Sequence, residues 1–358
     1  MKPVLKTPQP SRHPHPTVRA CRLAHLIFER PDLELAERFL TDFGLVTALK
    51  TDDTLYLRGT GPAPYCYRVH RGPRASLVGF GLCVPTETDL IKISQLPGAS
   101  PIEACDDPGG GQRCCLTDPS GFVVEAVYRQ AEAPVLERRS PLTFNDGAEP
   151  KRVNATQRPP AKPSEIIKLG HIVIEVAEYQ KTCEWYSRTF GFIPSDVQVL
   201  PDGSPLMTFM RLDLGDQPAD HHTMGIAQGF MPAYSHSAYE VVDADAVGMG
   251  QKILRERGWN HAWGIGRHVL GSQIFDYWQD PWGDKHEHYC DGDAFTAEKE
   301  MGVGWANPEA MAQWGQRMPA SFSRPKLTVE SLFGLFRSLK RSPDVTLKKV
   351  VTIVKLFG

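Results

Sequence analysis

An internal repeat constrains this chain more than any other feature. The segment RLAHLIFERPDLELAERFLTDFGLV, around residue 25, has a counterpart around residue 171, KLGHIVIEVAEYQKTCEWYSRTFGFI. Each copy has the pattern of a strand, then a helix, then a glycine (Gly44 or Gly191) that ends the helix. Each copy is later followed by an Asp-Pro-x-Gly turn between two strands. A repeated unit of this kind predicts two homologous halves.

The repeat divides the chain into five segments. They are a Pro-rich extended tail (1–21), a first half (22–130), a linker rich in Pro and charge (131–165), a second half (166–292) and a C-terminal extension (293–358). His171 follows His25 by 146 residues, whereas Asp280 follows Asp118 by 162, so the second half holds extra residues. Extra loop length in one of two copies indicates that this copy carries the function.

Composition excludes several classes of protein. The formal net charge is -2, which disfavours a general nucleic-acid binder. The sequence lacks the run of about 18 apolar residues that would predict a transmembrane helix. The first residues lack the apolar core of a secretory signal. The eight Cys include no C-x-x-C pair, so we interpret them as reduced thiols. We therefore expect a cytoplasmic protein without a nucleic-acid partner, and a membrane partner is disfavoured. We also expect a homo-oligomer.

Two His and one Glu in the second half lie on predicted strands. His171 lies in LGHIVIEV, His236 in SHSAYEVV, and Glu287 on the strand after the DPWG turn. A single strand His is more often structural than a ligand. On adjacent strands of a curved sheet, however, two His and one carboxylate can converge on one metal ion and leave its opposite face open for substrate. The joint pattern favours a metal site.

The first half departs from this pattern. It keeps His25 and Glu125, but the position that corresponds to His236 falls near Gly79, which has no side chain to bind a metal. We therefore interpret the first half as a scaffold whose site has decayed, with His25 as a hydrogen-bonded relic.

The repeats, with the segments LGHIVIEV, HSAYEV and DPWGDKHE, resemble the vicinal oxygen chelate superfamily, and more narrowly its two-domain type I extradiol catechol dioxygenases. The resemblance covers residues 22–292 and neither tail. It implies an α+β fold whose two domains each contain two βαβββ units in an open eight-stranded barrel. It implies Fe(II), or alternatively Mn(II), on His171, His236 and Glu287, with O2 as co-substrate. The implied reaction is cleavage of a substituted catechol ring beside its two hydroxyls.

The resemblance also implies further site residues. It places an active-site Tyr at Tyr277 and a substrate-binding His at His268. It places the acid/base His in the segment ADHHTMGIA, where the following apolar residues favour His222 and leave His221 as the alternative. Both could instead be solvated loop residues.

The substrate is less constrained. Biaryl and alkyl catechols both stay open, and Leu270 suggests a pocket of low polarity. The aromatic and large apolar side chains available for a pocket, several of which must be core, are Met207, Phe209, Trp259, Trp263, Phe275 and Trp278.

Two other functions are alternatives. A glyoxalase-like isomerase or lyase would use a metal with a fourth protein ligand and no O2. A non-catalytic protein would hold an aromatic ligand in the barrel without metal.

The end of the chain is basic and amphipathic. Residues 326–358 carry seven Lys and Arg against two acids. An apolar set with helical spacing comprises Val329, Leu332, Leu335, Phe336 and Leu339, and Pro343 ends that run. The β-branched segment LKKVVTIVKLF predicts a strand or a docking segment. The extension could pack on its own barrel, dock on another subunit of a homo-oligomer, or bind an anionic membrane surface. We expect the tail from Lys326 onward to be dispensable for chemistry, to serve association and not to reach the active site.

Overall fold

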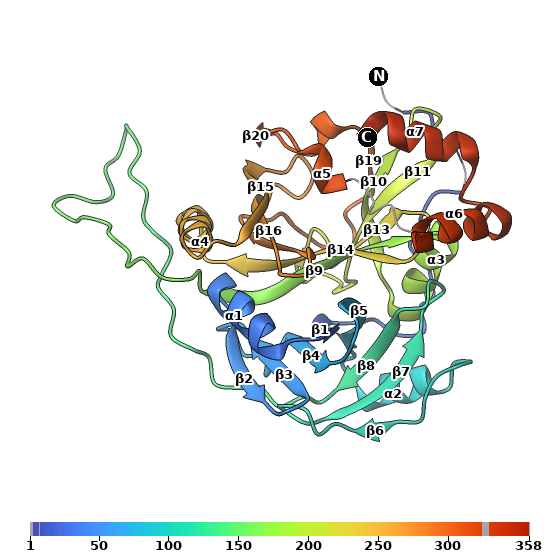
Figure 1. Ribbon diagram of the computed structural model, residues 1–358, viewed down its shortest axis with the longest axis horizontal. Helices are drawn as coiled ribbons and strands as arrows, with labels where there is room; N and C mark the ends of the chain where they lie inside the picture. The colour runs from blue at the N-terminus through green and yellow to red at the C-terminus, as the bar shows by residue number, and fades with distance from the viewer. Residues whose placement is uncertain (1–2, 7, 324–328, 358) are drawn as a thin grey trace.

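The computed structural model describes residues 3–6, 8–323 and 329–357 and has two halves, each built around one large sheet (Figure 1). The sheet of the first half has the strand order β2-β3-β4-β1-β5-β8-β7-β6. The second sheet has the order β19-β10-β11-β13-β9-β14-β17-β16-β15-β20. Without its outer strands β19 and β20, the second sheet repeats the order of the first, strand for strand. The predicted α+β fold with two related domains is confirmed.

The first half contains eight strands and two helices. Their bounds are β1 (Arg22–Arg30), α1 (Leu33–Phe43), β2 (Val46–Lys50), β3 (Thr54–Arg58), β4 (Tyr67–Arg71), β5 (Ser76–Cys83), α2 (Glu87–Ser94), β6 (Glu103–Ala104), β7 (Gln112–Thr117) and β8 (Val123–Tyr128).

The second half repeats this series with longer strands. Its elements are β9 (Ile166–Val176), α3 (Tyr179–Phe190), β10 (Ile193–Val199), β11 (Pro205–Arg211), β12 (Ala219–Asp220), β13 (Met224–Gln228), β14 (Ala233–Val241), α4 (Ala244–Glu256), β15 (Asn260–Arg267), β16 (Ile274–Gln279) and β17 (Lys285–Cys290). The short strand β12 lies outside the large sheet and pairs with β18 of the extension.

Local sequence explains the repeated helices. Asp32 caps α1 by accepting a hydrogen bond from the backbone N–H of Leu35 at 2.8 Å. Gly44 and Gly191 end α1 and α3 in the left-handed region, with φ of 115° and 75°. The predicted helix and its terminating glycine are thus confirmed in both copies.

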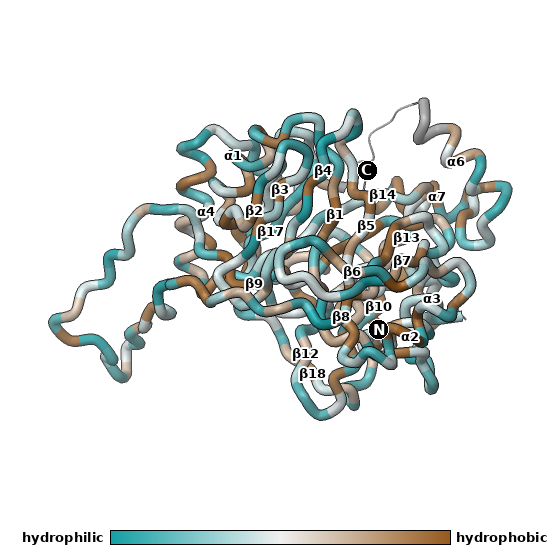
Figure 2. Tube along the Cα trace, turned by 90° about the horizontal axis from the view of Figure 1, so that it is seen from below, coloured by the Kyte–Doolittle hydropathy of each residue, from teal (hydrophilic) through white to brown (hydrophobic). Residues whose placement is uncertain are grey.

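The segments outside the repeat follow different paths. The linker between β8 and β9 projects from the body as a long loop, and it is largely hydrophilic in Figure 2, whereas the hydrophobic stretches concentrate in inner strands such as β1 and β5 (Figures 1 and 2). The N-terminal tail lies along the second domain, where the backbone N–H of Thr17 donates to the carbonyl of Arg188 at 2.8 Å. Val18 and Ala20 are buried there.

The extension adds small elements to the second domain. They are β18 (Ala294–Phe295), β19 (Gly302–Trp305), a short 3-10 helix (Pro308–Ala310), β20 (Trp314–Gly315), α5 (Ala320–Ser323), α6 (Val329–Arg341) and α7 (Leu347–Phe357). The helix predicted before Pro343 is confirmed as α6. Lys326, and the side chains of Val329 and Leu332, lie outside the described part of the chain.

The predicted strand in the last segment is wrong, because α7 is a helix. Strands β19 and β20 form the two edges of the second sheet, and α7 pairs with neither of them. The helix instead packs Ile353 and Leu356 against a small cluster of Leu200, Leu206 and Ala306. This tertiary contact outweighs the β-propensity of Val and Ile. The extension therefore packs on its own domain.

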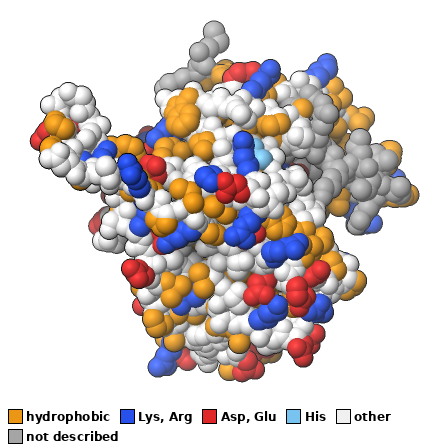
Figure 3. Space-filling view, turned by 60° about the vertical axis from the view of Figure 1, so that its left-hand side comes forward, with side chains coloured by type: hydrophobic (Ala, Val, Ile, Leu, Met, Phe, Trp, Pro, Cys, Tyr) orange, Lys and Arg blue, Asp and Glu red, His pale blue; other side chains and the backbone are white. Residues whose placement is uncertain are grey.

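The surface and the thiols agree with the composition. Acidic and basic side chains are interspersed on the face drawn in Figure 3. All eight Cys are free. Among the described residues, no helix is long and apolar enough to cross a bilayer.

Candidate active site and metal centre

Three neighbouring strands of the second sheet bring the proposed metal ligands together. His171 on β9 and Glu287 on β17 both face Ala238 of β14 in the strand register, and His236 lies two residues before Ala238 on β14. One ligand atom from each of the three residues lies within 4.8 Å of the others. Oε2 of Glu287 is 3.3 Å from Nε2 of His171 and 3.6 Å from Nε2 of His236. This is the two-histidine, one-carboxylate arrangement expected from the sequence.

The chemistry of these side chains fits a cation. Glu287 is fully buried, and neither of its oxygens has a hydrogen-bond partner. Burial raises the pKa of Glu287, but the nearby His171 and His268 outweigh it and hold the pKa below its ordinary value. Burial also lowers the pKa of His236 well below its ordinary value. An ionised carboxylate with unused lone pairs, beside two imidazoles, is a donor set for a divalent transition metal.

The two adjacent histidines take different positions. His222 lines the cavity beside the ligands, and its ring centroid is 4.0 Å from that of His171. His221 lies behind it, where Nδ1 of His221 is 3.0 Å from Nδ1 of His222. Both side chains are buried, so the solvated-loop alternative is wrong. Burial, with the neighbouring rings of His171 and His221, lowers the pKa of His222 well below its ordinary value.

His268 and Tyr277 stand on the other side of the ligands. Tyr277 on β16 lies opposite Glu287 in the strand register, and its hydroxyl is 2.9 Å from Nε2 of His268. The second nitrogen of His268, Nδ1, is 2.8 Å from the carbonyl oxygen of Met311. Burial and then the Glu287 carboxylate raise the pKa of Tyr277 well above its ordinary value, so the phenol keeps its proton.

A cavity of about 230 Å³ opens onto these residues. Of the side chains proposed for an aromatic pocket, Met207 and Phe209 line it, as does Leu270. The others do not line it: Trp263, Phe275 and Trp278 are buried in hydrophobic clusters, and Trp259 packs on Phe39. Along β16, Trp278 points to the opposite face from Tyr277, whereas Phe275 and Trp263 share the face of Tyr277 and pack with it in one hydrophobic cluster.

The C-terminal extension supplies lining that the sequence did not indicate. Met311, Met318, Phe322 and Ile353 all line the cavity. The expectation that the tail from Lys326 onward does not reach the site is wrong, because Ile353 lines the cavity; that this tail is dispensable for chemistry stays a prediction. No motif marks these residues, because their role depends on how α5 and α7 pack over the second sheet. Gln198, Gln228 and Gln273 also line the cavity and were missed, since isolated glutamines carry no distinctive signal in a sequence.

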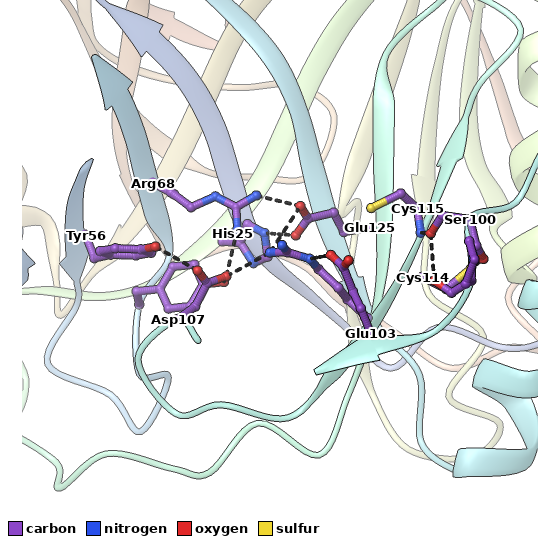
Figure 4. Close-up of polar contacts among 12 residues, drawn as sticks. His25, Tyr56, Arg68, Ser100, Glu103, Asp107, Cys114, Cys115 and Glu125 are labelled. Carbon is purple, nitrogen blue, oxygen red and sulfur yellow. Dashed lines mark hydrogen bonds and ion pairs between the residues drawn. The ribbon is translucent and has the colours of Figure 1, made fainter. Parts of the chain in front are cut away.

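The corresponding place in the first half holds a guanidinium (Figure 4). His25 Nε2 is 2.9 Å from Glu125 Oε2, as in a two-residue remnant of the ligand set. Arg68 donates to Glu125 at 2.5 Å and to Asp107 at 2.7 Å. Tyr56 donates to Asp107 from the far side at 2.7 Å. In the first half, a guanidinium side chain thus supplies the positive charge, and the carboxylates of Glu125 and Asp107 are hydrogen-bonded to other side chains.

Glycines complete the difference between the halves. In the register with β8, Gly81 lies opposite Glu125 as Ala238 lies opposite Glu287, so Gly79 occupies the place of His236. A Cβ on Gly79 would lie 1.9 Å from the carbonyl oxygen of Val123. The backbone approach leaves no space for a third ligand.

The comparisons with known proteins agree with this geometry. Residues 168–287 match the family described as the Glyoxalase/Bleomycin resistance protein/Dioxygenase superfamily. A protein called metapyrocatechase 2, from Cupriavidus necator, is 28% identical over 318 residues, which cover 88% of this chain and 94% of that protein.

Solved structures share the fold. Homoprotocatechuate 2,3-dioxygenase from Brevibacterium fuscum has a TM-score of 0.72 at 17% identity, covering 88% of this chain and 94% of that one. A Mn(II)-bound glyoxalase from Novosphingobium aromaticivorans also has a TM-score of 0.72, at 20% identity, covering 87% of this chain and 96% of that one. These two structures have different activities, so the shared fold by itself selects neither.

The matched segment lies in the second domain and includes His171, His236 and Glu287, so the buried donor set lies in the part of the chain that matches the Glyoxalase/Bleomycin resistance protein/Dioxygenase superfamily. The chain as a whole shares its two-domain fold with the solved homoprotocatechuate 2,3-dioxygenase.

Proposed function

We propose that this protein is a metal-dependent extradiol dioxygenase that cleaves a substituted catechol beside its two hydroxyls. The observation that carries the proposal is the composition of one cavity. It presents a three-residue metal site on one wall, with His222 on one side and the linked His268 and Tyr277 on the other. The relative named metapyrocatechase 2 supports the same reaction class.

The proposed ligands are His171, His236 and Glu287, and the proposed metal is Fe(II), with Mn(II) as the alternative. Three ligands that occupy one face leave other positions open. When bound, the metal would supply a positive charge that lowers the pKa of the catechol hydroxyls and open positions for the diol and O2.

The surrounding side chains have distinct proposed roles. His222, neutral and at the cavity wall, accepts a proton from a catechol hydroxyl and later returns it. Tyr277 keeps its proton and donates a hydrogen bond toward the reacting oxygens. His268 orients Tyr277 through their 2.9 Å contact and closes the substrate side of the cavity. The buried walls exclude bulk water from these proton transfers.

The lining also supports a substrate with an apolar substituent. Away from the metal site, the cavity wall consists largely of aliphatic, thioether and aromatic groups, including Leu206, Met207, Phe230 and Met318. Such a wall favours alkyl or aryl groups, because they lose water at little cost there.

Loading with Fe(II) under anaerobic conditions, followed by a panel of catechols, tests the proposal. We expect oxygen consumption together with a yellow ring-opened product. His171→Ala, His236→Ala and Glu287→Ala should each abolish both signals. Folded, iron-loaded protein that binds catechols but consumes no O2 would refute the proposal. Isomerisation of a glutathione-type adduct without O2 would then favour the glyoxalase-like function, for which the described residues offer no fourth ligand in the cluster.

A further inference from the structure

We propose that His221 and Asp196 are positioning residues that fix the tautomer of His222, so that its Nε2 is the unprotonated nitrogen available to the substrate. The inference rests on the proposed function for its catalytic meaning. The arrangement itself is a chain of three buried or half-buried side chains. Asp196 Oδ2 is 2.7 Å from Nε2 of His221, and Nδ1 of His221 is 3.0 Å from Nδ1 of His222.

The direction of each hydrogen bond follows from the groups involved. A carboxylate only accepts, so Nε2 of His221 carries the proton that is shared with Asp196. When the imidazole of His221 carries a single N–H, that N–H is the one facing Asp196, so Nδ1 of His221 accepts. The hydrogen bond between the rings then requires the proton of His222 to be on Nδ1. His222 Nε2 is left with a free lone pair, on a ring that lines the cavity.

Packing holds the chain of groups in place. His221 is 1% exposed and is enclosed by Phe209 and Phe295, whose ring centroids lie 5.8 Å and 5.4 Å from its own. Its backbone N–H donates to the carbonyl of Asp293 at 2.8 Å. His221 therefore cannot turn toward the cavity without opening this packing, and its role is to act through His222.

The C-terminal extension contacts Asp196, the residue at the other end of this hydrogen-bonded series of side chains. Asp196 on β10 lies opposite Gly302 of β19 in a parallel pairing. A Cβ on Gly302 would lie 1.9 Å from Oδ1 of Asp196, so the carboxylate rests directly against this glycine. The side chain of Asp196 is 17% exposed, which leaves it room to accept an isosteric amide without unfolding.

Asp196→Asn tests the inference, because an amide can donate to Nε2 of His221 and so reverse both ring tautomers. The tautomer is read by nitrogen-15 NMR of histidine-labelled full-length protein loaded with Zn(II), a diamagnetic ion. We expect the His222 proton on Nδ1 in the wild type and on Nε2, in part or fully, in Asp196→Asn. In the iron-loaded enzyme, kcat should fall about 10²–10⁴-fold with unchanged metal content and KM, as when an acid/base histidine loses its orienting carboxylate.

Two further variants complete the design. Asp202→Asn makes the same change at an exposed carboxylate beside Gly203, at the turn between β10 and β11, and should leave the tautomer and kcat unchanged. Gly302→Ala displaces the Asp196 carboxylate without altering its charge and should lower kcat in the same direction. A wild-type tautomer in Asp196→Asn, or a kcat within twofold of wild type, would overturn the inference. If the wild type cleaves no catechol, the proposed function fails, while the NMR result still decides the tautomer.

Discussion

The guanidinium of the first half gives the sharpest stability prediction. Arg68 is only 5% exposed, and its partners Glu125 and Asp107 are 6% and 10% exposed. Arg68→Met removes the buried guanidinium and leaves Glu125 and Asp107 with Arg113 alone, which is 3.8 Å and 3.2 Å from them. Breaking a buried ion pair on one side typically costs about 3–5 kcal/mol. That is a large share of the roughly 5–15 kcal/mol by which a protein is stable.

Arg74→Met is the matched control. Arg74 also pairs with a glutamate, Glu29 at 3.0 Å, but its side chain is 73% exposed. An exposed pair contributes about 0–1 kcal/mol, so this variant should be close to wild type. For a domain of about 100 residues, each kcal/mol shifts Tm by roughly 4–8 °C. Arg68→Met should therefore lower the Tm of the first half by about 12 °C or more.

The assay combines calorimetry with hydrogen exchange. All seven Trp lie in the second half or the extension, so their fluorescence reports mainly on those segments, whereas exchange in β1, β4 and β8 reports on the first half. Adding Glu125→Gln to Arg68→Met should restore part of the stability by removing an uncompensated charge. Equal Tm values for Arg68→Met and Arg74→Met would refute the reasoning.

The acid dependence has a defined sign. Burial raises the pKa of Glu125, but His25 and Arg68 outweigh it and lower the pKa to about 2, from an ordinary value of 4.5. The stabilisation from this lowered pKa is fully present above pH 4.5 and is lost as the pH falls toward 2. The Tm difference between Arg68→Met and wild type should shrink over that interval.

Three further predictions concern the second half and the extension. His236→Ala should lose bound iron, measured by elemental analysis, whereas His25→Ala should keep it. The reverse result would place the metal in the first half and contradict the assignment. His222→Phe should keep iron and catechol binding but lower kcat about 10²–10⁴-fold, and a wild-type kcat would remove His222 from the proton transfer. A chain that ends after residue 325 loses Ile353 from the cavity wall, so KM for alkyl and aryl catechols should rise about tenfold or more, while that of unsubstituted catechol changes less. Equal changes for both substrate classes would show that Ile353 does not contact the substituent.

The sequence by itself determined the duplicated architecture and the ligand triad. Strand periodicity, the terminating glycines and the Asp-Pro-x-Gly turns are local signals, and they recur at corresponding places in both halves. His171, His236 and Glu287 could be proposed because alternation along a strand fixes the face of each side chain. The resemblance to a known family then supplied His222, His268 and Tyr277 as candidates.

Only the tertiary structure decided the rest, because the deciding contacts join segments distant in sequence. The choice between His221 and His222 for the cavity position depended on where Asp196 and Phe295 lie, far along the chain from both histidines. Arg68 could not be identified as the cation of the first half, since an arginine in a strand has no distinctive spacing. The segment predicted as a strand is the helix α7, which packs Ile353 against an apolar cluster of the second domain. The scale of β-propensity spans only about 1 kcal/mol and depends on context, so packing of this kind overrides it.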